Sequence, residues 1–300
     1  MQDAAYLALL AKITTTGIDE AEFEQLFAAA VARDDAPSIV VLHLIAGRVE
    51  EAVAHAARVD ADAARAIVRH IAALDPHSPG WDTLVGIVET RPELVGEIEA
   101  ALAAWPVSAR CLPAAWLAEI RKGKHHPRHR LVQSVMLDGS EVDVLRSPAC
   151  ARSLANVQHL AVNMAEGGGL AELQGAGLDA VTSLSITQSV VSPRAVGDLI
   201  VGASFPRLQR LSLSGLSSDR PYSGRREYPN LIPRDIDNPL ELDAIAKGLD
   251  GRSTQRPRFS LGLNALGSDA EGLRALVRQP ALAGIEQLAF AGIYLDEGAA

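Results

Sequence analysis

Aromatic residues are scarce in this chain, at 4 % of 300 residues, although 48 % of the residues are hydrophobic. Burial must therefore come from leucine, valine, isoleucine and alanine, which suit many thin stacked layers better than one thick core. Cysteine is also scarce, and Cys111 and Cys150 alone cannot form a disulfide framework or a four-cysteine zinc site. We expect both to be small buried thiols in a reducing environment.

Long hydrophobic runs are absent as well. The longest candidate, residues 38–47, contains His43 and falls short of the roughly 20 apolar residues that a membrane-spanning helix needs. Near the amino terminus an acidic residue, Asp3, precedes the first basic residue, Lys12, which is not typical of a secretory signal. We therefore expect a cytoplasmic protein that does not enter a membrane.

The motifs of common catalytic sites are missing too. The chain has no G-x-S-x-G, H-E-x-x-H or C-x-x-C motif, and the glycines at 167–169 lack the Lys-Ser/Thr of a phosphate-binding loop. His125, His126 and His129 could bind a metal, but Pro127 interrupts any helix between them and no carboxylate follows closely. The sequence thus predicts a protein that is not an enzyme and has no catalytic residue, metal or cofactor.

Charge is unevenly distributed along the chain. Residues 1–120 carry a net charge of −10 and residues 131–300 a net charge of −4, which places a domain boundary near residue 125. Between them lies a basic segment that could contact nucleic-acid phosphates or the acidic amino-terminal half: Arg121, Lys122, Lys124, Arg128 and Arg130. It contains no aromatic residue for base stacking, and the whole chain is at −9, which argues against nucleic acid.

Residues 1–125 show helical periodicity and predict an all-helical bundle or an alpha-solenoid. Asp19 and Glu22 form a variant of the capping box, Asp60 can cap a later helix, and Pro37 suits a first helical turn. The two prolines within residues 75–79 predict a loop. Further helices are expected at about residues 81–89, 92–104 and 112–121. No fixed period is present here, so no helical repeat family is identified.

Residues 126–300 form the second predicted domain and repeat a frame of the pattern apolar-x-x-apolar-x-apolar. Its middle positions are Val135, Leu160, Leu184, Leu211, Leu261 and Leu288, at steps of 25, 24, 27, 50 and 27 residues. Each frame predicts a short strand whose alternate side chains are buried, with helix-like stretches between the strands. One such unit cannot cover its own apolar face, so the units must stack.

Two stretches of this domain resemble the leucine-rich repeat family. Residues 287–300, QLAFAGIYLDEGAA, are similar to the L-x-L-x-x-N-x-I…D-E-G-A-x-A unit of long, ribonuclease-inhibitor-like repeats, and residues 261–272 look like a shortened version. Over about residues 130–300 the resemblance implies an α/β fold, a curved solenoid with a concave parallel sheet and outer helices. The family's buried turn asparagine is matched only by Asn264, so we expect irregular turns.

Two surfaces are candidates for binding a partner protein. The outward strand positions of the sheet, which on the first strand are Ser134, Met136 and Asp138, form a small and weakly polar surface. The candidates on this surface are His159, Asn163, Arg210, Asn264 and Gln287. The second surface is an irregular insertion at 214–239, which contains Arg220, Tyr222, Arg225, Arg226, Tyr228 and Arg234. Such a long connection is usually functional or disordered, and both interpretations stay open.

Three functions are compatible with these patterns. The first is a non-catalytic scaffold or adaptor that binds another protein through the solenoid and the insertion. The second is a regulator or inhibitor of a partner enzyme or GTPase, with an arginine near Arg225 acting on the partner. The third is a nucleic-acid-associated protein that uses the basic segment. The strand at 285–290 is also expected at an open sheet edge, where the chain could pair with another copy.

Overall fold

The chain divides into two compact units, residues 1–110 and 111–300, in a computed structural model. The structure describes residues 19–74, 76, 78–163, 173, 176–187, 190–191, 205–214, 217–218, 259–264, 267–268, 274, 276–278, 280, 285–291 and 294–295. The division falls before the boundary that the charge pattern suggested near residue 125. The basic segment and the helix that precedes it therefore belong to the second unit.

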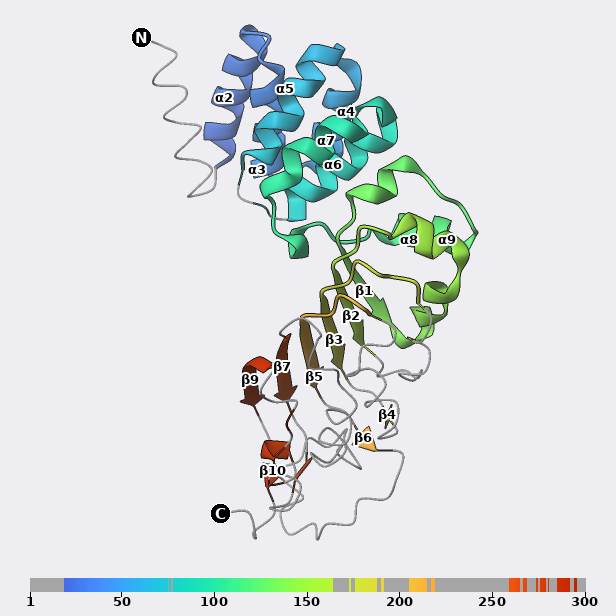
Figure 1. Cartoon of the computed structure of the whole chain (residues 1–300). Helices are drawn as coiled ribbons and strands as arrows, with labels where there is room; N and C mark the ends of the chain where they lie inside the picture. Colours follow the sequence, from blue (N-terminus) through green and yellow to red (C-terminus); the bar gives the residue numbers. More distant parts are fainter. Residues whose placement is uncertain are drawn as a thin grey trace. The chain divides into compact units, whose positions relative to one another are not determined.

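The first unit consists of short helices, as the periodicity predicted (Figure 1). They are α2 (Glu20–Ala32), α3 (Ala36–Ile45), α4 (Val49–Arg58), α5 (Ala61–Ala72), α6 (Ser78–Thr90), η1 (Pro92–Leu94), α7 (Val95–Ala101), η2 (Leu102–Ala104) and η3 (Val107–Ala109). The residues just before α2 and α5 explain where these two helices begin. The backbone N of Glu22 donates to Oδ1 of Asp19, and the N of Ala63 donates to Oδ1 of Asp60, both at 2.8 Å. These two predicted caps are confirmed.

Helix α6 begins earlier than the sequence predicted. Residues 75–79 were expected to form a loop because two prolines lie there, yet the helix starts at Ser78. Pro79 thus lies in the first turn, where a missing N–H interrupts no helical hydrogen bond. Its carbonyl accepts a hydrogen bond of 2.9 Å from Oγ1 of Thr83. The loop prediction was wrong for these two residues, and Asp75 and His77 lie outside the described residues.

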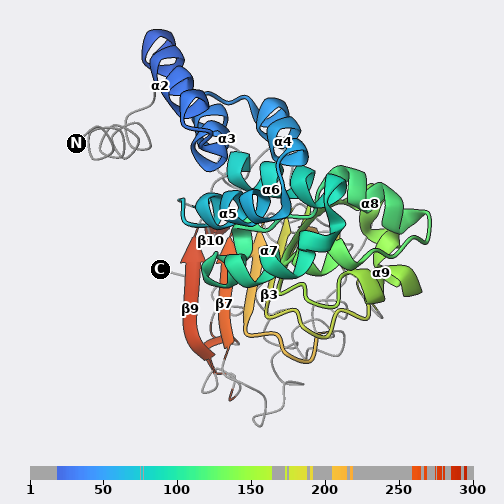
Figure 2. The same cartoon turned by 90° about the horizontal axis from the view of Figure 1, so that it is seen from above.

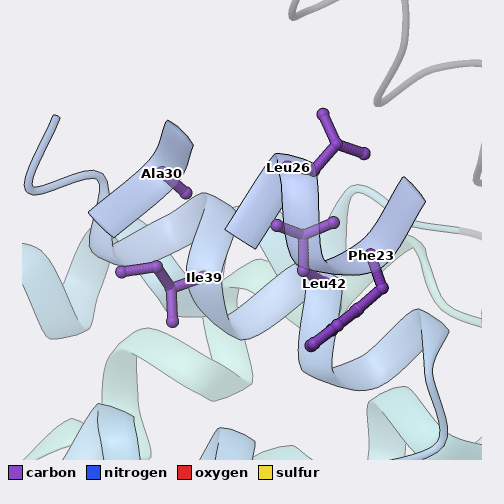
Figure 3. Packing of buried hydrophobic residues seen from close by; sticks show 5 residues of the cluster. All are labelled: Phe23, Leu26, Ala30, Ile39 and Leu42. Carbon is purple, nitrogen blue, oxygen red and sulfur yellow. The ribbon is translucent and has the colours of Figure 1, made fainter. Parts of the chain in front are cut away.

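Helices α2 and α3 pack through a small apolar cluster (Figure 3). Its buried members are Phe23, Leu26, Ala30, Ile39 and Leu42. The Phe23 ring stacks on Phe27 with ring centroids 5.4 Å apart, and the guanidinium of Arg48 lies 4.3 Å from the Phe23 centroid. The His43 ring of α3 meets Phe27 edge-on with ring centroids 5.1 Å apart, so rings from both helices join a contact that is otherwise mainly aliphatic.

Gly86 marks a close approach between α6 and α4, because a Cβ atom there would lie 2.5 Å from Cγ2 of Val53. We expect Gly86→Ala to lower the free energy of unfolding of the first unit by about 1–2 kcal/mol. Crowding of a stiff β-branched side chain outweighs the roughly 0.5–1 kcal/mol that alanine gains over glycine in a helix. Urea unfolding followed by circular dichroism at the helical signal measures the change.

Val53→Ala in the same chain provides the control for this prediction. The double variant Gly86→Ala, Val53→Ala should recover most of the loss caused by Gly86→Ala, because the added methyl group then occupies the space that Val53 leaves. If Gly86→Ala instead raised stability in the presence of Val53, the two helices would not be in the close contact described here.

The second unit holds a six-stranded parallel sheet, so the chain as a whole is mixed α/β, as predicted (Figures 1 and 2). The strands are β1 (Ser134–Asp138), β2 (His159–Asn163), β3 (Ser183–Thr187), β5 (Arg210–Ser214), β7 (Phe259–Asn264) and β9 (Ile285–Ala291), in that order across the sheet. The helices are α8 (Ala114–Arg121), η4 (Pro127–Leu131), η5 (Gly139–Arg146) and α9 (Pro148–Ser153). In Figure 2, α8 and α9 lie toward the end of the sheet that is away from β7 and β9.

The predicted frames coincide with these strands. Equivalent paired residues are Ser134, His159, Ser183, Arg210, Ser260 and Gln287, at the same steps of 25, 24, 27, 50 and 27 residues as the frames. Because β5 and β7 are direct neighbours, the long step adds no strand to the sheet. Leu160, Leu184 and Leu211 are fully buried, which confirms the alternation at the middle positions of β2, β3 and β5.

Four short strands were not predicted: β4 (Val190–Val191), β6 (Ser217–Ser218), β8 (Gly267–Ser268) and β10 (Tyr294–Leu295). Strand β4 pairs with β6 and β8 pairs with β10, both in parallel. Each begins three residues after the preceding long strand ends. The same spacing of a long and a short strand therefore recurs at β3, β5, β7 and β9.

The β1 edge of the sheet is covered by the start of the unit. Cys111 bridges to Ser134 in parallel, and the backbone N of Leu112 donates to the Ser134 carbonyl at 2.9 Å. Ser134 is consequently only 1 % exposed, although it was expected on the outward surface. At the other edge, β9 pairs with β7, and no further strand pairs with it among the described residues. In the described part of the chain, no helix combines the length and apolar character that crossing a bilayer requires.

Candidate functional site

One face of the sheet is exposed and carries mostly small polar side chains. This open face is formed by Met136, Asp138, His159, Ala161, Asn163, Ser183, Ser185, Thr187, Arg210, Ser212, Ser214, Ser260 and Gly262. The side chains between them along β1, β2, β3 and β5 point to the other face and are buried. The middle residues of the strands pair with one another and form a row across the sheet: Met136, Ala161, Ser185, Ser212 and Gly262. Small side chains leave this row low and accessible.

At the carboxyl ends of β1, β2 and β3 the open face is hollowed. This strand-end hollow has a volume of about 490 Å³ and is lined by Met136, Leu137, Asp138, Glu141, Ala161, Val162, Asn163, Ser185 and Thr187. Its volume lies within the range of roughly 300–1,000 Å³ found for ligand pockets. The carboxyl ends of parallel strands are also where open α/β sheets commonly bind ligands. The hollow is therefore our candidate site.

Two carboxylates give the hollow an acidic side. Asp138 ends β1 and is exposed, and Glu141 follows in the first turn of η5. Oε2 of Glu141 accepts a hydrogen bond of 3.2 Å from the backbone N of Asp138, which holds this side chain at the strand end. Oε1 of Glu141 lies 3.9 Å from Nη1 of Arg121. None of the residues that line the hollow is basic, so its lining is net negative.

The structure does not gather the predicted sheet residues at one place. Asn163 lines the hollow at the carboxyl end of β2. His159 and Arg210 are the first residues of β2 and β5, so they lie at the amino ends of the strands, away from the hollow. Asn264 shares the last row with Asn163 but lies three strands away, about 14 Å at the usual strand spacing. Gln287 lies further out, on β9. Only Asn163 of these residues belongs to the candidate site.

His159 forms a side-chain hydrogen bond to the neighbouring strand. Its Nδ1 lies 2.9 Å from Oγ of Ser134, which joins β2 to β1 through side chains. Burial, with a smaller contribution from Arg210, lowers the pKa of His159 below its usual value. The imidazole is therefore neutral at pH 7 and serves as a hydrogen-bonding partner within the sheet.

The sequence did not single out Met136, Asp138 and Glu141 as site residues. Met136 and Asp138 were expected at outward positions, and the spacing of Asp138 and Glu141 is typical of a helix start. Only the pairing of β1 with β2 and of β2 with β3 brings them beside Asn163 and Thr187. The predicted insertion residues Arg220, Tyr222, Arg225, Arg226, Tyr228 and Arg234 lie outside the described residues.

The basic segment is partly neutralised by its own unit. Nη2 of Arg128 donates to Oε2 of Glu119 at 2.5 Å. Nη2 of Arg121 lies 3.8 Å from Oδ1 of Asp143. Two of the five cations proposed to contact phosphates thus already face carboxylates. This weakens the case for nucleic-acid binding, because a paired cation releases fewer counterions from a phosphate backbone.

His129, at the centre of the histidine cluster, is fully buried beside Trp116, with ring centroids 5.7 Å apart. Its Nδ1 accepts from the backbone N of His126 at 3.4 Å, and its Nε2 lies 3.5 Å from Oε2 of Glu119. Burial is the main cause that lowers the pKa of His129 to about 4. Within the described ranges, no three His, Cys, Asp or Glu side chains are grouped to hold a metal ion.

We expect the stability of the second unit to fall as the pH is lowered from about 6.5 to 4. The pKa of His129 is about 4 in the folded chain and near 6.5 when unfolded, so the unfolded state binds more protons in this window. The contribution of His129 to the free energy of unfolding is fully present above pH 6.5 and is at most about 3 kcal/mol. Urea unfolding followed by tryptophan fluorescence at pH 7, 6 and 5 measures it. His129→Gln should flatten the pH dependence, and an unchanged slope would contradict this origin.

The open face and the strand-end hollow have to be interpreted from their own chemistry. A search of models of known protein families gave no match to this chain, and a search of curated proteins gave no significant relative.

Proposed function

We propose that this chain is a protein-interaction scaffold or adaptor that binds a partner with the open face of its sheet. The observation that carries the proposal is the continuous run of exposed or half-buried positions from β1 to β7, which no described helix or strand of the second unit covers. The faces of a parallel sheet in α/β proteins are usually covered by helices on both sides. A face that stays open with small polar side chains is suited to contact another molecule.

The proposal includes membership of the leucine-rich repeat type. Sequential parallel strands, steps near 25 residues and a short second strand three residues after each of four long strands support a stacked repeat. In a solenoid of this type each unit covers its neighbour, and the exposed strand faces together form one continuous surface. The curvature, the outer helices and the family itself are part of this proposal.

The open face alone is small for a stable complex. Five strands at about 4.8 Å spacing and five residues at about 3.3 Å rise span on the order of 400 Å². A standard interface buries about 800 Å² on each partner. We therefore propose that the insertion at 214–239, with its arginines and tyrosines, supplies further contact area. Deletion of residues 219–236 is expected to weaken partner binding by about tenfold or more, which a titration of the captured partner would measure.

Site-specific photo-crosslinking tests the proposed function. A benzophenone amino acid replaces Ser185 or Ser212 on the open face, and Arg152 of α9 in a control chain, because Arg152 is exposed outside the sheet. In nuclease-treated lysate, we expect the two open-face positions to label the same discrete protein and position 152 not to label it. Equal labelling from position 152, or recovery of nucleic acid alone in untreated lysate, would contradict the proposal.

A regulator or inhibitor of an enzyme or GTPase would use the same surfaces, so the identity of the labelled partner distinguishes it from a passive adaptor. Self-association through β9 is a separate possibility that light scattering of the purified chain tests. A monomer at all concentrations would exclude it.

A further inference from the structure

The strand-end hollow has negative charge that the described residues compensate only in part. Asp138 and Glu141 are its charged lining residues, and no described cation lies within ion-pair distance of Asp138. The Glu141 carboxylate is 27 % exposed, with its single ion pair at 3.9 Å. Two carboxylates on one wall of a partly enclosed hollow attract a cation more strongly than the same groups on a flat surface.

An apolar surface lies directly beside these carboxylates. Met136 is 69 % exposed, an unusual exposure for a large apolar residue, and it neighbours Asp138 on the open face of β1. Next to Met136, Ala161 of β2 continues an apolar floor. A long cationic side chain can lay its aliphatic part on such a floor while its charged end reaches the carboxylates.

The remaining lining residues offer oxygen acceptors at defined positions. Asn163 and Thr187 follow Asp138 in the last row of the sheet, and Ser185 lies in the middle row. A guanidinium group has five planar donors that can bind a carboxylate through two hydrogen bonds and still reach further acceptors. A lysine ammonium group has three donors and no such planar geometry. The arrangement favours arginine.

We propose that the strand-end hollow binds an arginine side chain in an extended segment of a partner protein. The proposal rests on the proposed function and specifies the chemistry of the partner. A volume of about 490 Å³ holds the arginine together with part of a neighbouring side chain. Since the hollow lies at the ends of adjacent strands, the partner segment crosses the strands and continues along the low row of Ser185 and Ser212.

The test uses the full chain labelled with ¹³C at its methionine methyl groups. The sequence has three methionines, so Met136 gives one of three signals and is assigned with Met136→Leu. The probe is N-acetyl-arginine amide, compared with N-acetyl-lysine amide and the neutral N-acetyl-glutamine amide. We expect a saturable shift of the Met136 signal with the arginine probe, a weaker response to lysine and none to glutamine. The response to arginine should decrease with added salt.

Matched variants locate the charge that is responsible. Asp138→Asn is expected to weaken the arginine response by about tenfold, because it removes a charge-assisted hydrogen bond. Asp143→Asn makes the same change on η5 outside the hollow and should leave the response within about twofold. An equal response to glutamine, equal effects of the two variants or no shift with arginine would overturn the proposal. Open-face crosslinking together with any of these outcomes would leave the proposed function standing and remove only the arginine assignment.

Discussion

Leu184→Ala is expected to lower the free energy of unfolding of the second unit by about 3–4 kcal/mol. Leu184 is fully buried in β3, and the register places it between Leu160 of β2 and Leu211 of β5. The strands on both sides are held by parallel pairing, so they cannot close the cavity that the lost side chain leaves. Hydrogen exchange in increasing urea, followed in peptides from residues 134–163 and 183–187, measures the loss in this unit separately.

Ser185→Ala is the matched control on the same strand. Its side chain points to the open face, so we expect a change within about 0.5 kcal/mol. A large loss for both variants would contradict the alternation of buried and exposed positions in β3. The same peptides and the same urea series serve for both variants.

Trp116→Ala is expected to lower the free energy of unfolding of the second unit by about 3–5 kcal/mol. The indole is fully buried in α8, 5.7 Å from the ring of His129, and the guanidinium of Arg128 lies 5.4 Å from its ring centroid. Removing it leaves a large cavity and admits water to His129. Because burial is the main cause of the lowered pKa of His129, that pKa should also return toward 6.5.

Trp116→Phe separates these two effects. Phenylalanine keeps an aromatic side chain in the cavity, so the stability loss should be about half or less of that for alanine. Nuclear magnetic resonance of the imidazole protons measures the pKa of His129 in both variants. A low pKa that persists in Trp116→Ala would show that burial by this side chain is not its cause.

The strands could be predicted because their signal is local. Val135, Leu160, Leu184 and Leu211 each lie two residues before another apolar residue. Both this period of two and the spacing between frames can be recognised in a single sequence. The caps at Asp19 and Asp60 are local as well, since each side chain reaches a backbone N three residues away. Such contacts require no knowledge of the tertiary structure.

The candidate site depended on contacts between distant segments. Asp138 and Asn163 meet because β1 and β2 pair in one particular register, and a shift by one residue would turn one of them to the buried face. The sequence offered His129 only as one of three histidines that could bind a metal, whereas η4 places it against Trp116 of α8. Ser134 was expected on the outward surface, but it is buried where Cys111 pairs with it and His159 forms a hydrogen bond to it. In each case the deciding partner lies outside the local sequence pattern.

The strictly sequential strand order has a consequence for how this sheet can form during synthesis. Each long strand after β1 pairs with the long strand made just before it, so β2, β3 and β5 can each add to the sheet as soon as they are synthesised. The step to β7 is about twice as long as the others, which adds only about 0.6 kcal/mol to the entropy of closing the connection. The sheet can therefore grow by adding one strand at a time at one edge. Strand β7 joins later than the others because more chain must be made first, and the longer connection adds little to the free-energy cost of its pairing.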